Sequence, residues 1–452
     1  MINYFTVKLC SLTAMTGFLF GYDTGIISGS MIFIKDEMEL STFWIELIVS
    51  CTVGFAWLSA WSSAFISDKI GRKSMIILTS ILFMIASLVM GLAPDKNILL
   101  LGRAIAGCAV GLGSIYAPIY IAELAPKKHR GSLVTFNSAF ITFGLFASTL
   151  LASFFSYLPS HIGWRLGFAS LPSFLQMVGF YFMPESPRWL CILGKYDEAL
   201  EIMIKIYGDI DIAKENVKVE TTITKQLNES YFVKLKKVFN NKETRYALII
   251  GCSLHMAQQW CGINTIMYYG AIIIQMSGVL SKRISIWFTV VVAVTNALTS
   301  LIGLFIIDKV TRRKLTLISM VGIVICLALM GIIFTKIQKT EYCPNENGYL
   351  VLIVLCLFLF CFEFGIGPMA WGINSEIYPM WARSVSVSFA ASFNWLNNMI
   401  VSFTFLTISE YISMQNTFYL YMLISTFFTF IFYFYLPETK HKSMEDSLIF
   451  RH

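Results

Sequence analysis

The chain contains twelve long apolar runs separated by short polar segments, and this pattern restricts its fold more than any other feature. About 20 apolar residues in a helix cross the ~30 Å hydrocarbon core of a bilayer. In that core a helix satisfies all its backbone polar groups internally. We therefore predict an all-α membrane protein with twelve transmembrane helices at about residues 4–29, 45–66, 74–93, 97–121, 132–156, 164–183, 246–272, 284–307, 315–335, 349–375, 384–408 and 415–436.

Composition excludes a soluble protein. Hydrophobic residues make up 56% of the 452 residues and charged residues only 13%, whereas soluble domains carry about 25% charged residues. The first run is long enough to span a membrane and lacks a small-residue cleavage site, so we expect it to be retained. The ten cysteines are scattered without a CxxC pair, and we expect no disulfide framework, no metal site and no cofactor.

Positive charge is distributed unevenly between the two sides of the predicted membrane. The segments on one side carry 25 Lys and Arg residues, whereas the loops on the other side carry six. Because cytoplasmic loops are enriched in Lys and Arg, we expect both termini to be cytoplasmic. The net charge of +7 therefore reflects the basic residues of the cytoplasmic segments. We therefore expect the lipid bilayer, and no nucleic acid, as a partner.

The chain reads as two related halves. Residues 1–183 and 246–436 each hold six runs; residues 184–245 form a cytoplasmic linker with short helices such as Tyr196–Tyr207, and residues 437–452 form a short tail. Charged turns at membrane edges are the alternative explanation, but three matched motifs at two offsets favour a repeat. Repeated six-helix units are typical of transporters that rock one half against the other. The matches pair Asp68-Lys-Ile-Gly71-Arg72-Lys73 with Asp308-Lys-Val-Thr311-Arg312-Arg313, Glu123-Leu-Ala-Pro126 and Arg130 with Glu376-Ile-Tyr-Pro379 and Arg383, and Pro184-Glu185-Ser186 with Pro437-Glu438-Thr439.

A single acid, Asp23, lies inside the first apolar run. An ionisable group there costs several kcal/mol unless it is paired, hydrated or protonated. Its helix carries glycines every four residues, which allow a neighbouring backbone to approach closely; they are Gly17, Gly21, Gly25 and Gly29. We predict that Asp23 takes up and releases a proton during transport. The alternative is a structural acid locked permanently to a basic partner.

Taken in order, these motifs resemble the sugar porter family of the major facilitator superfamily, and the resemblance covers essentially the whole chain. It implies a transporter, not an enzyme, that carries a small polyhydroxyl substrate by alternating access. The motifs are Gly71-Arg72, Gly102-Arg103, Ala122-Glu-Leu-Ala-Pro126, Pro184-Glu-Ser-Pro-Arg188-Trp-Leu190, Gln258-Gln259, Gly262-Ile-Asn264, Gly367-Pro368, Ser375-Glu-Ile-Tyr-Pro379, Asn394-Trp395 and Pro437-Glu-Thr-Lys440.

Several amides within apolar spans of the second half form a candidate substrate site. Amides both donate and accept hydrogen bonds, as hydroxyl groups do, and an indole can stack on the C–H face of a ring. A single membrane amide more often joins helices. Gly262 and Pro368 should loosen or bend the helices that carry them. The candidates are Gln258, Gln259, Asn264, Asn296, Trp371, Asn394 and Asn398, and by resemblance all except Asn394 match the family's sugar-contacting positions.

Ser138 departs from the pattern of sugar transporters, which usually carry a glutamine at this position of the fifth span. A serine cannot reach as far, so a hexose contact from the first half is lost. The animal proton-coupled myo-inositol cotransporters resemble the chain better at this position. They also resemble it over Gly262-Ile-Asn-Thr-Ile-Met-Tyr-Tyr269 and Gln275-Met-Ser-Gly278. The loop at about 336–348 is shorter than theirs.

Acids and bases at the cytoplasmic helix ends form a candidate gate. Opposite charges there can latch the two halves and must part when the carrier opens inward. The alternative is solvated charge worth about 0–1 kcal/mol a pair. Thr311 stands where the first half has Gly71, so the second latch should be looser. The gate candidates are Asp68, Arg72, Glu123, Arg130, Glu185, Arg188, Asp308, Arg312, Glu376, Arg383 and Glu438.

Arg103, in the fourth span, is the predicted partner of Asp23, and the resemblance implies such a couple in proton-driven porters. We predict symport of a proton with myo-inositol or a related polyol, by a monomer in the plasma membrane. A proton-coupled or facilitative hexose carrier is the alternative, and a transporter-shaped nutrient sensor is a third reading. His255, one turn before Gln258, either tunes the site or packs. The other histidines do not cluster by spacing.

Overall fold

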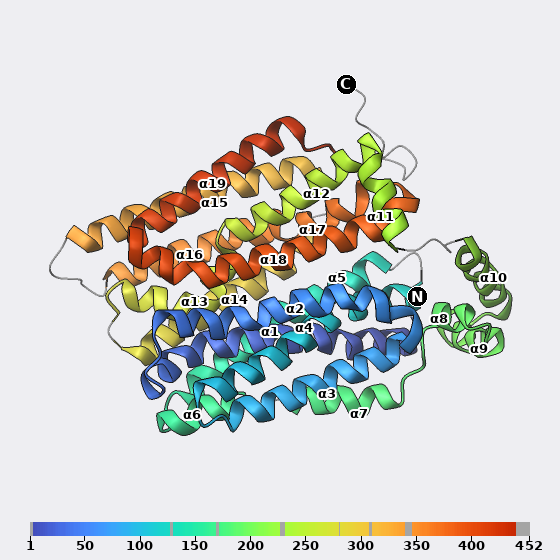
Figure 1. The fold of residues 1–452 in the computed structure, drawn as a ribbon, viewed down its shortest axis with the longest axis horizontal. Coiled ribbons are helices and arrows are strands. Elements are labelled where there is room, and N and C mark those ends of the chain that lie inside the picture. The colour runs from blue at the N-terminus through green and yellow to red at the C-terminus, as the bar shows by residue number, and fades with distance from the viewer. Residues whose placement is uncertain are drawn as a thin grey trace. The chain divides into compact units, whose positions relative to one another are not determined.

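The computed structural model describes residues 3–126, 130–168, 171–226, 231–279, 281–306, 310–339 and 346–439 (Figure 1). These residues form helices joined by short turns, and the described part of the chain contains no strand. The long polar linker holds four short helices, α8 to α11. The all-helical architecture predicted from the apolar runs is confirmed.

The described helices make twelve passes of membrane-spanning length. The seventh and tenth each break into two helices, and the sixth is described as two helices on either side of residues 169–170, which lie outside the described residues. The first six are α1 (Tyr4–Glu37), α2 (Thr42–Ile70), α3 (Arg72–Gly91), α4 (Lys96–Leu124), α5 (Arg130–Phe155), and α6 (Ser160–Gly167) with α7 (Leu171–Tyr181). The second six are α12 (Lys242–Trp260) with α13 (Ile263–Met276), α14 (Lys282–Ile306), α15 (Arg312–Lys339), α16 (Glu346–Phe364) with α17 (Ile366–Glu376), α18 (Met380–Ile412) and α19 (Met414–Tyr435).

Nine of these described passes are long and apolar enough on their own to span a membrane. The seventh and eleventh do not meet this criterion because they are rich in polar side chains, and the two described helices of the sixth are each too short. Polar residues inside spanning helices usually line a functional path. The two polar passes, α12–α13 and α18, carry most of the predicted substrate-site amides.

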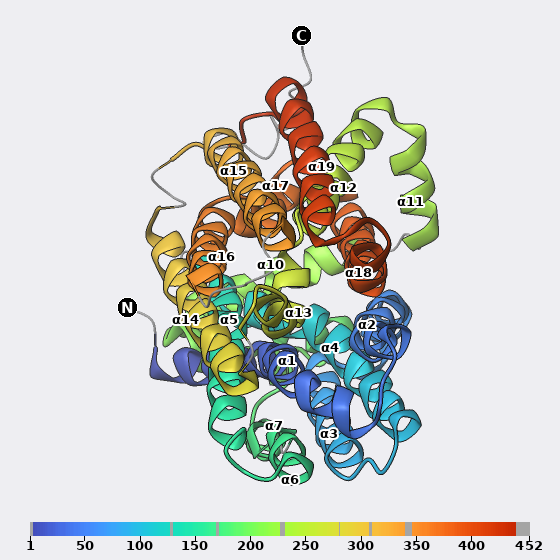
Figure 2. The same ribbon diagram turned by 90° about the vertical axis from the view of Figure 1, so that its left-hand side faces the viewer.

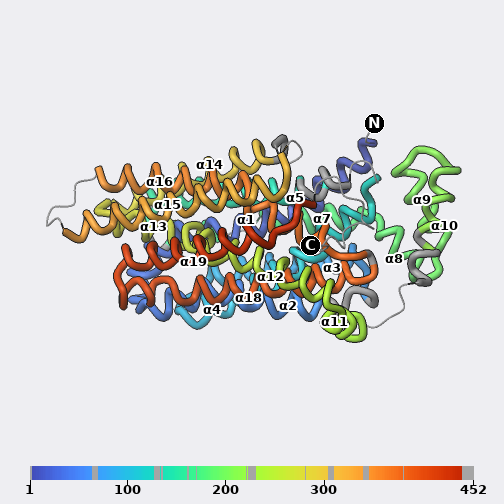
Figure 3. Tube along the Cα trace, turned by 90° about the horizontal axis from the view of Figure 1, so that it is seen from above, coloured from blue at the N-terminus to red at the C-terminus, as the bar shows by residue number. Residues whose placement is uncertain are grey.

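The chain separates into two compact units, and the first comprises Met1–Asp23, Phe55–Leu145 and Phe168–Ser230. In this unit α3 packs against α4 and α7 (Figure 1). Its core holds buried aliphatic and aromatic side chains, among them Met75, Tyr116, Tyr120 and Phe180. The short helices α8 (Pro187–Ile192), α9 (Tyr196–Tyr207) and α10 (Ile210–Gln226) pack on one another (Figure 3). Helix α9 has the bounds predicted for a linker helix.

The second unit comprises Thr24–Gly54, Phe146–Gly167 and Tyr231–His452. In it α15 packs between α16 and α19 (Figure 2), α14 packs on α16, and α12 packs on α18. Helix α11 (Tyr231–Asn240) also contacts α12 and α18. The division into halves at residues 183 and 246 stays a prediction, because the units reflect packing and not sequence repeats.

The glycines of α1 allow its main chain to touch that of α5. A Cβ built on Gly21 would lie 1.8 Å from the carbonyl oxygen of Ile141, and one on Gly17 would lie 2.6 Å from that of Asn137. From the opposite side, a Cβ on Gly144 would lie 2.1 Å from the Phe18 carbonyl oxygen. The close backbone approach predicted from the glycine spacing is therefore confirmed.

We expect Gly21→Ala to destabilise the protein severely, because the methyl group cannot fit unless α1 and α5 separate. Overpacking of this kind costs about 1–3 kcal/mol or more. Thermal unfolding of the purified protein in detergent measures the effect. Gly372→Ala is the matched control, because a Cβ there meets nothing within 4 Å. Equal melting temperatures for the two variants would contradict this packing.

Candidate functional site

The seventh pass breaks inside the predicted substrate site. Helix α12 ends at Trp260 and α13 begins at Ile263, with Gly262 between them at φ +89°. Only glycine adopts this conformation without strain, and a Cβ there would lie 2.8 Å from the Tyr421 ring. The loosening predicted at Gly262 is confirmed. The break leaves Gln258 and Gln259 in the last turn of α12, and both side chains are buried.

The tenth pass also breaks, at Gly365, between α16 and α17. Pro368 is the physical cause, because its ring excludes the carbonyl of Phe364, the residue with which α16 ends. The freed backbone finds partners on α15: the Ile366 N–H donates to Ser319 Oγ at 2.9 Å, and that hydroxyl donates to the Cys361 carbonyl at 2.7 Å. The bend predicted from Pro368 is present, and it begins three residues before the proline.

Asn394 of α18 is the centre of a buried amide network. Its Oδ1 accepts a hydrogen bond from Gln259 Nε2 at 3.0 Å, and its Nδ2 donates to Gln258 Oε1 at 2.8 Å. Gln258 Nε2 donates in turn to the Gly367 carbonyl at 2.8 Å. The network therefore joins α12, α18 and the broken tenth pass through side chains that are all buried.

His255 belongs to the same network. Asn394 Nδ2 lies 3.0 Å from His255 Nδ1, and an amide nitrogen can only donate. His255 Nδ1 must therefore accept, which places the proton of the neutral ring on Nε2. That Nε2 is buried without a hydrogen-bond partner among the described residues, so its N–H can serve a hydroxyl or a water. The ring also meets Trp371 edge to face, with centroids 4.7 Å apart.

The other candidates differ in how they join this cluster. Asn264 Nδ2 donates to Gln259 Oε1, and Asn398 accepts from Ser402 Oγ at 3.1 Å. Asn296 lies on α14, and its buried Oδ1 has no partner among the described residues. Trp371 leaves 44% of its surface exposed, so its indole is available to a ligand. Ser138 lies on α5 in the first unit, and its side chain is exposed.

Asp23 and Arg103 form a buried ion pair in the first unit. Arg103 Nη1 lies 2.8 Å from both carboxylate oxygens, and both side chains are almost fully buried. Removing one member of such a pair leaves an uncompensated charge away from water. Protonation of Asp23 would remove its charge in the same way, so Arg103 would then lose this charged partner.

The first-half gate candidates gather around the start of α3. Arg72 pairs with Glu123 through Nε at 3.2 Å and Nη2 at 3.3 Å. Glu185 Oε1 accepts from the backbone N–H groups of Arg72 and Lys73 at 3.0 and 2.9 Å. A carboxylate at this position satisfies free helix N–H groups and complements the helix dipole. Ser186 donates to Glu123 and closes the cluster.

The second half repeats this arrangement around the start of α15. Glu438 accepts from the backbone N–H groups of Arg312 and Arg313 at 3.0 and 3.2 Å. Arg312 Nη2 lies 3.6 Å from Glu376 Oε1, and Thr439 donates to Glu376 Oε2 at 2.6 Å. The residues that the motif comparison matched thus make corresponding contacts in the two clusters. The second ion pair is longer than the first, and Thr311 has no positive φ where Gly71 has φ +88°.

These contacts join neighbouring helix ends within each cluster, so the role as a latch between halves stays a prediction. Arg188 lies on α8, and Arg383 on α18 donates to the Tyr378 carbonyl at 3.0 Å. Three further gate candidates cannot be placed: Asp308 and the side chains of Asp68 and Arg130 lie outside the described residues.

We expect Glu123→Ala to destabilise the protein more than Glu376→Ala. The Arg72–Glu123 side chains are 7% and 6% exposed, whereas those of Arg312 and Glu376 are 15% and 35% exposed. Breaking a buried pair costs about 3–5 kcal/mol, and an exposed pair contributes about 0–1 kcal/mol. Melting temperatures of the two variants test this order, and a larger loss for Glu376→Ala would contradict it.

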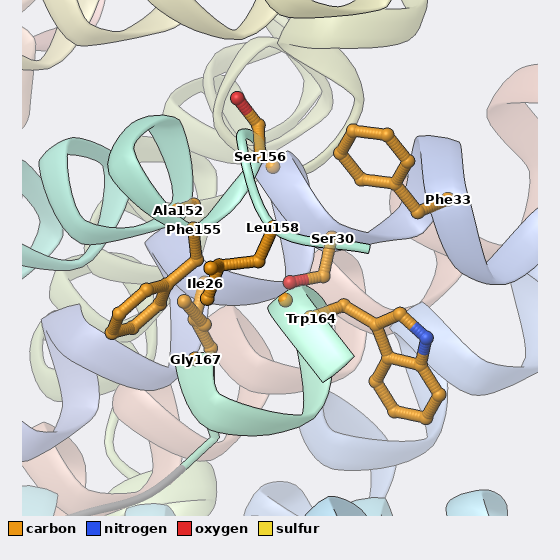
Figure 4. Close-up of a pocket in the computed structure, with 11 residues that line it drawn as sticks. Ile26, Ser30, Phe33, Ala152, Phe155, Ser156, Leu158, Trp164 and Gly167 are labelled. Carbon is orange, nitrogen blue, oxygen red and sulfur yellow. The ribbon is translucent and has the colours of Figure 1, made fainter. Parts of the chain in front are cut away.

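A small cavity lies in the second unit between α1, α5 and α6 (Figure 4). Ile26, Ser30, Phe155 and Trp164 are among its walls, and its volume is about 10 Å³. Ser30 Oγ is buried with no hydrogen-bond partner among the described residues. This space suits a single water molecule and is far too small for a polyol.

Comparison with known proteins adds independent evidence. The family model described as "Sugar (and other) transporter" matches residues 9–447. The proton myo-inositol cotransporter of Homo sapiens is 36% identical, over 98% of this chain and 81% of its own length. The galactose-proton symporter of Escherichia coli K12 is 33% identical, over 97% and 93%. A solved inward-open structure of the xylose transporter XylE from E. coli aligns with a TM-score of 0.82 at 25% identity, over 98% of this chain and 99% of that one.

Proposed function

Since the chain belongs to the Sugar (and other) transporter family, we propose that it carries myo-inositol or a related polyol across a membrane together with a proton. The buried Asp23–Arg103 pair supports this most directly, because ionisable residues inside membrane spans commonly mark proton or ion paths. Relatives with matching length are named as proton-coupled cotransporters of inositol and galactose.

The amide network, with Trp371 beside it, is the proposed substrate site. Gln258, Gln259, Asn264 and Asn394 offer donors and acceptors at the breaks of two helices, and Asn398 lies one turn from Asn394. Trp371 adds a partly exposed aromatic face. Asn296 and Ser138 complete the proposed set from other helices. A ring with hydroxyl groups on every carbon needs such a surface of mixed donors and acceptors.

The proton is coupled to the substrate as a second ligand. With Asp23 charged, Arg103 holds it; entry of water and a proton neutralises the carboxylate and frees Arg103. The loaded carrier then switches, and release of the proton inside restores the pair. Coupling of this kind is reciprocal, so the proton gradient drives the substrate and the substrate gradient drives the proton.

We also infer that both termini are cytoplasmic, that the protein acts as a monomer, and that it lies in the plasma membrane. The excess of Lys and Arg on one side supports the orientation. The two gate clusters then lie at the cytoplasmic ends of the helices.

Uptake of labelled myo-inositol and labelled glucose into proteoliposomes, with and without an inward proton gradient, tests the proposal. We expect gradient-stimulated inositol uptake that glucose does not compete with. Glucose uptake that ignores the gradient would instead identify a facilitative hexose carrier, which shares the amide network. In the inositol case Ser138→Gln is the next variant, because the longer amide restores the contact that hexose carriers use.

A further inference from the structure

Glu46 is a buried acid that the proposed transport mechanism does not use. It lies one turn into α2, in the part of that helix that belongs to the second unit, and is 1% exposed. Its Oε1 accepts a hydrogen bond from the backbone N–H of Thr407 at 2.8 Å, and its Oε2 is 2.5 Å from the Thr407 hydroxyl. Both oxygens therefore bind one residue of α18.

The contact with the Thr407 backbone is unusual. Thr407 lies inside α18, where an N–H ordinarily donates to the carbonyl four residues earlier. A carboxylate that reaches this N–H competes with the helix's own hydrogen-bond ladder, and such insertions bend helices. The Glu46 side chain of α2 thus accepts a hydrogen bond from the backbone of α18.

Other contacts near Glu46 join the same face of α2 to α18. Thr42 Oγ1 donates to Glu410, and the Phe43 and Phe403 rings meet edge to face at 6.0 Å. Two turns beyond Glu46, a Cβ on Gly54 would lie 3.0 Å from Met399 Sδ. Residues four apart share a helix face, so Glu46, Ser50 and Gly54 form one stripe toward α18.

Among the described residues of this unit, an exposed ion pair also joins α1 to α14. Lys282 and Asp36 pair where α14 begins and α1 ends, but their side chains are 40% and 55% exposed. Solvent screening leaves an exposed ion pair with little net contribution to stability, whereas a hydrogen bond to a buried charged group is among the stronger polar contacts. The Glu46–Thr407 contact therefore holds these segments together more strongly than the Lys282–Asp36 pair does.

We propose that Glu46 is a positioning residue of the transport cycle, whose carboxylate holds α2 on α18 at the outer side and must release Thr407 when the carrier opens outward. This inference rests on the proposed function, because alternating access and the cytoplasmic termini define the outer side. A merely structural anchor would stay in place throughout the cycle. A gating anchor biases the free protein toward the outwardly closed state.

The test measures outward opening without any substrate. Ser50→Cys is introduced into a variant whose ten cysteines are replaced by serine, and a membrane-impermeant maleimide is applied from outside. Ser50 is 3% exposed in this structure, so it reacts only when α2 parts from α18. We expect Glu46→Met, which loses both hydrogen bonds, to raise the labelling rate at least about tenfold.

Two further variants separate gating from folding. Glu46→Gln keeps an acceptor for the N–H and a donor for the Thr407 oxygen, so it should label like the parent protein. Thr407→Val removes only the hydroxyl and should raise labelling by a smaller factor than Glu46→Met. In transport, the outward bias should lower both the external KM and kcat of Glu46→Met.

Unchanged labelling in a folded Glu46→Met protein would overturn the inference. So would an equal increase in Glu46→Gln, because that variant retains the contacts. If Glu46→Met fails to fold, unchanged labelling of Thr407→Val decides against the inference in the same way. The labelling needs no transported molecule, so failure of the proposed polyol transport would be seen separately.

Discussion

Asp23→Asn is expected to keep exchange of substrate down its gradient and to lose uphill accumulation. Asparagine preserves the shape of the side chain and a contact with Arg103, but it cannot bind and release a proton. An inward gradient of one pH unit is worth about 1.4 kcal/mol per proton and supports about tenfold accumulation. The variant should therefore show an accumulation ratio of about one. Counterflow and gradient-driven uptake of labelled myo-inositol in proteoliposomes measure the two activities.

Asp36→Asn is the matched control for this experiment. It makes the same substitution on the same helix at a carboxylate that is 55% exposed. Its accumulation should equal that of the parent protein. If Asp23→Asn still accumulated substrate, Asp23 would be a structural acid and the proton would have to enter elsewhere.

Asn394→Asp is expected to abolish high-affinity substrate binding although it barely changes the volume of the side chain. A carboxylate cannot donate, so it loses the hydrogen bonds to Gln258 Oε1 and His255 Nδ1. Each buried polar group left without its partner costs about 1–3 kcal/mol. The KM for myo-inositol should therefore rise at least about tenfold, as measured in initial rates of gradient-driven uptake.

Asn397→Asp serves as the comparison, because Asn397 is on the same helix and just as buried. It accepts from Trp260 Nε1 at 2.9 Å and donates only to the Phe393 carbonyl of its own helix. The aspartate keeps the Trp260 contact, so the KM should change much less. Equal KM values for the two variants would show that Asn394 joins helices and does not position the substrate.

The elements that could be predicted from sequence are those that the bilayer itself dictates. A span must be long and apolar, so the predicted helix limits lie within about four residues of the observed ones, except that α1 continues well beyond its apolar run to Glu37. Charges inside such spans need a partner, and Arg103 was the basic residue available to Asp23. The break at Gly262 could be predicted because glycine is the residue type that adopts a positive φ without strain.

The side-chain contacts that could not be predicted are those between helices whose packing the sequence does not reveal. The position of His255 one turn before Gln258 suggested from sequence that it could belong to the site. Its tautomer could not be predicted, because it depends on the hydrogen bond from Asn394 of α18. Glu46 is a single acid in an apolar run, as Asp23 is, yet its partners are a hydroxyl and a backbone N–H, which no sequence pattern distinguishes. Arg72 and Glu123 lie far apart in the chain, and it is the packing of α3 on α4 that brings them together as an ion pair.

The central claim is that movement of a polyol and movement of a proton are one event. The most direct test is to add myo-inositol outside proteoliposomes that contain a pH-sensitive dye and start with equal pH on both sides. The account predicts acidification of the interior that depends on the protein and is absent with Asp23→Asn. Uptake of labelled myo-inositol with no change of internal pH would contradict it.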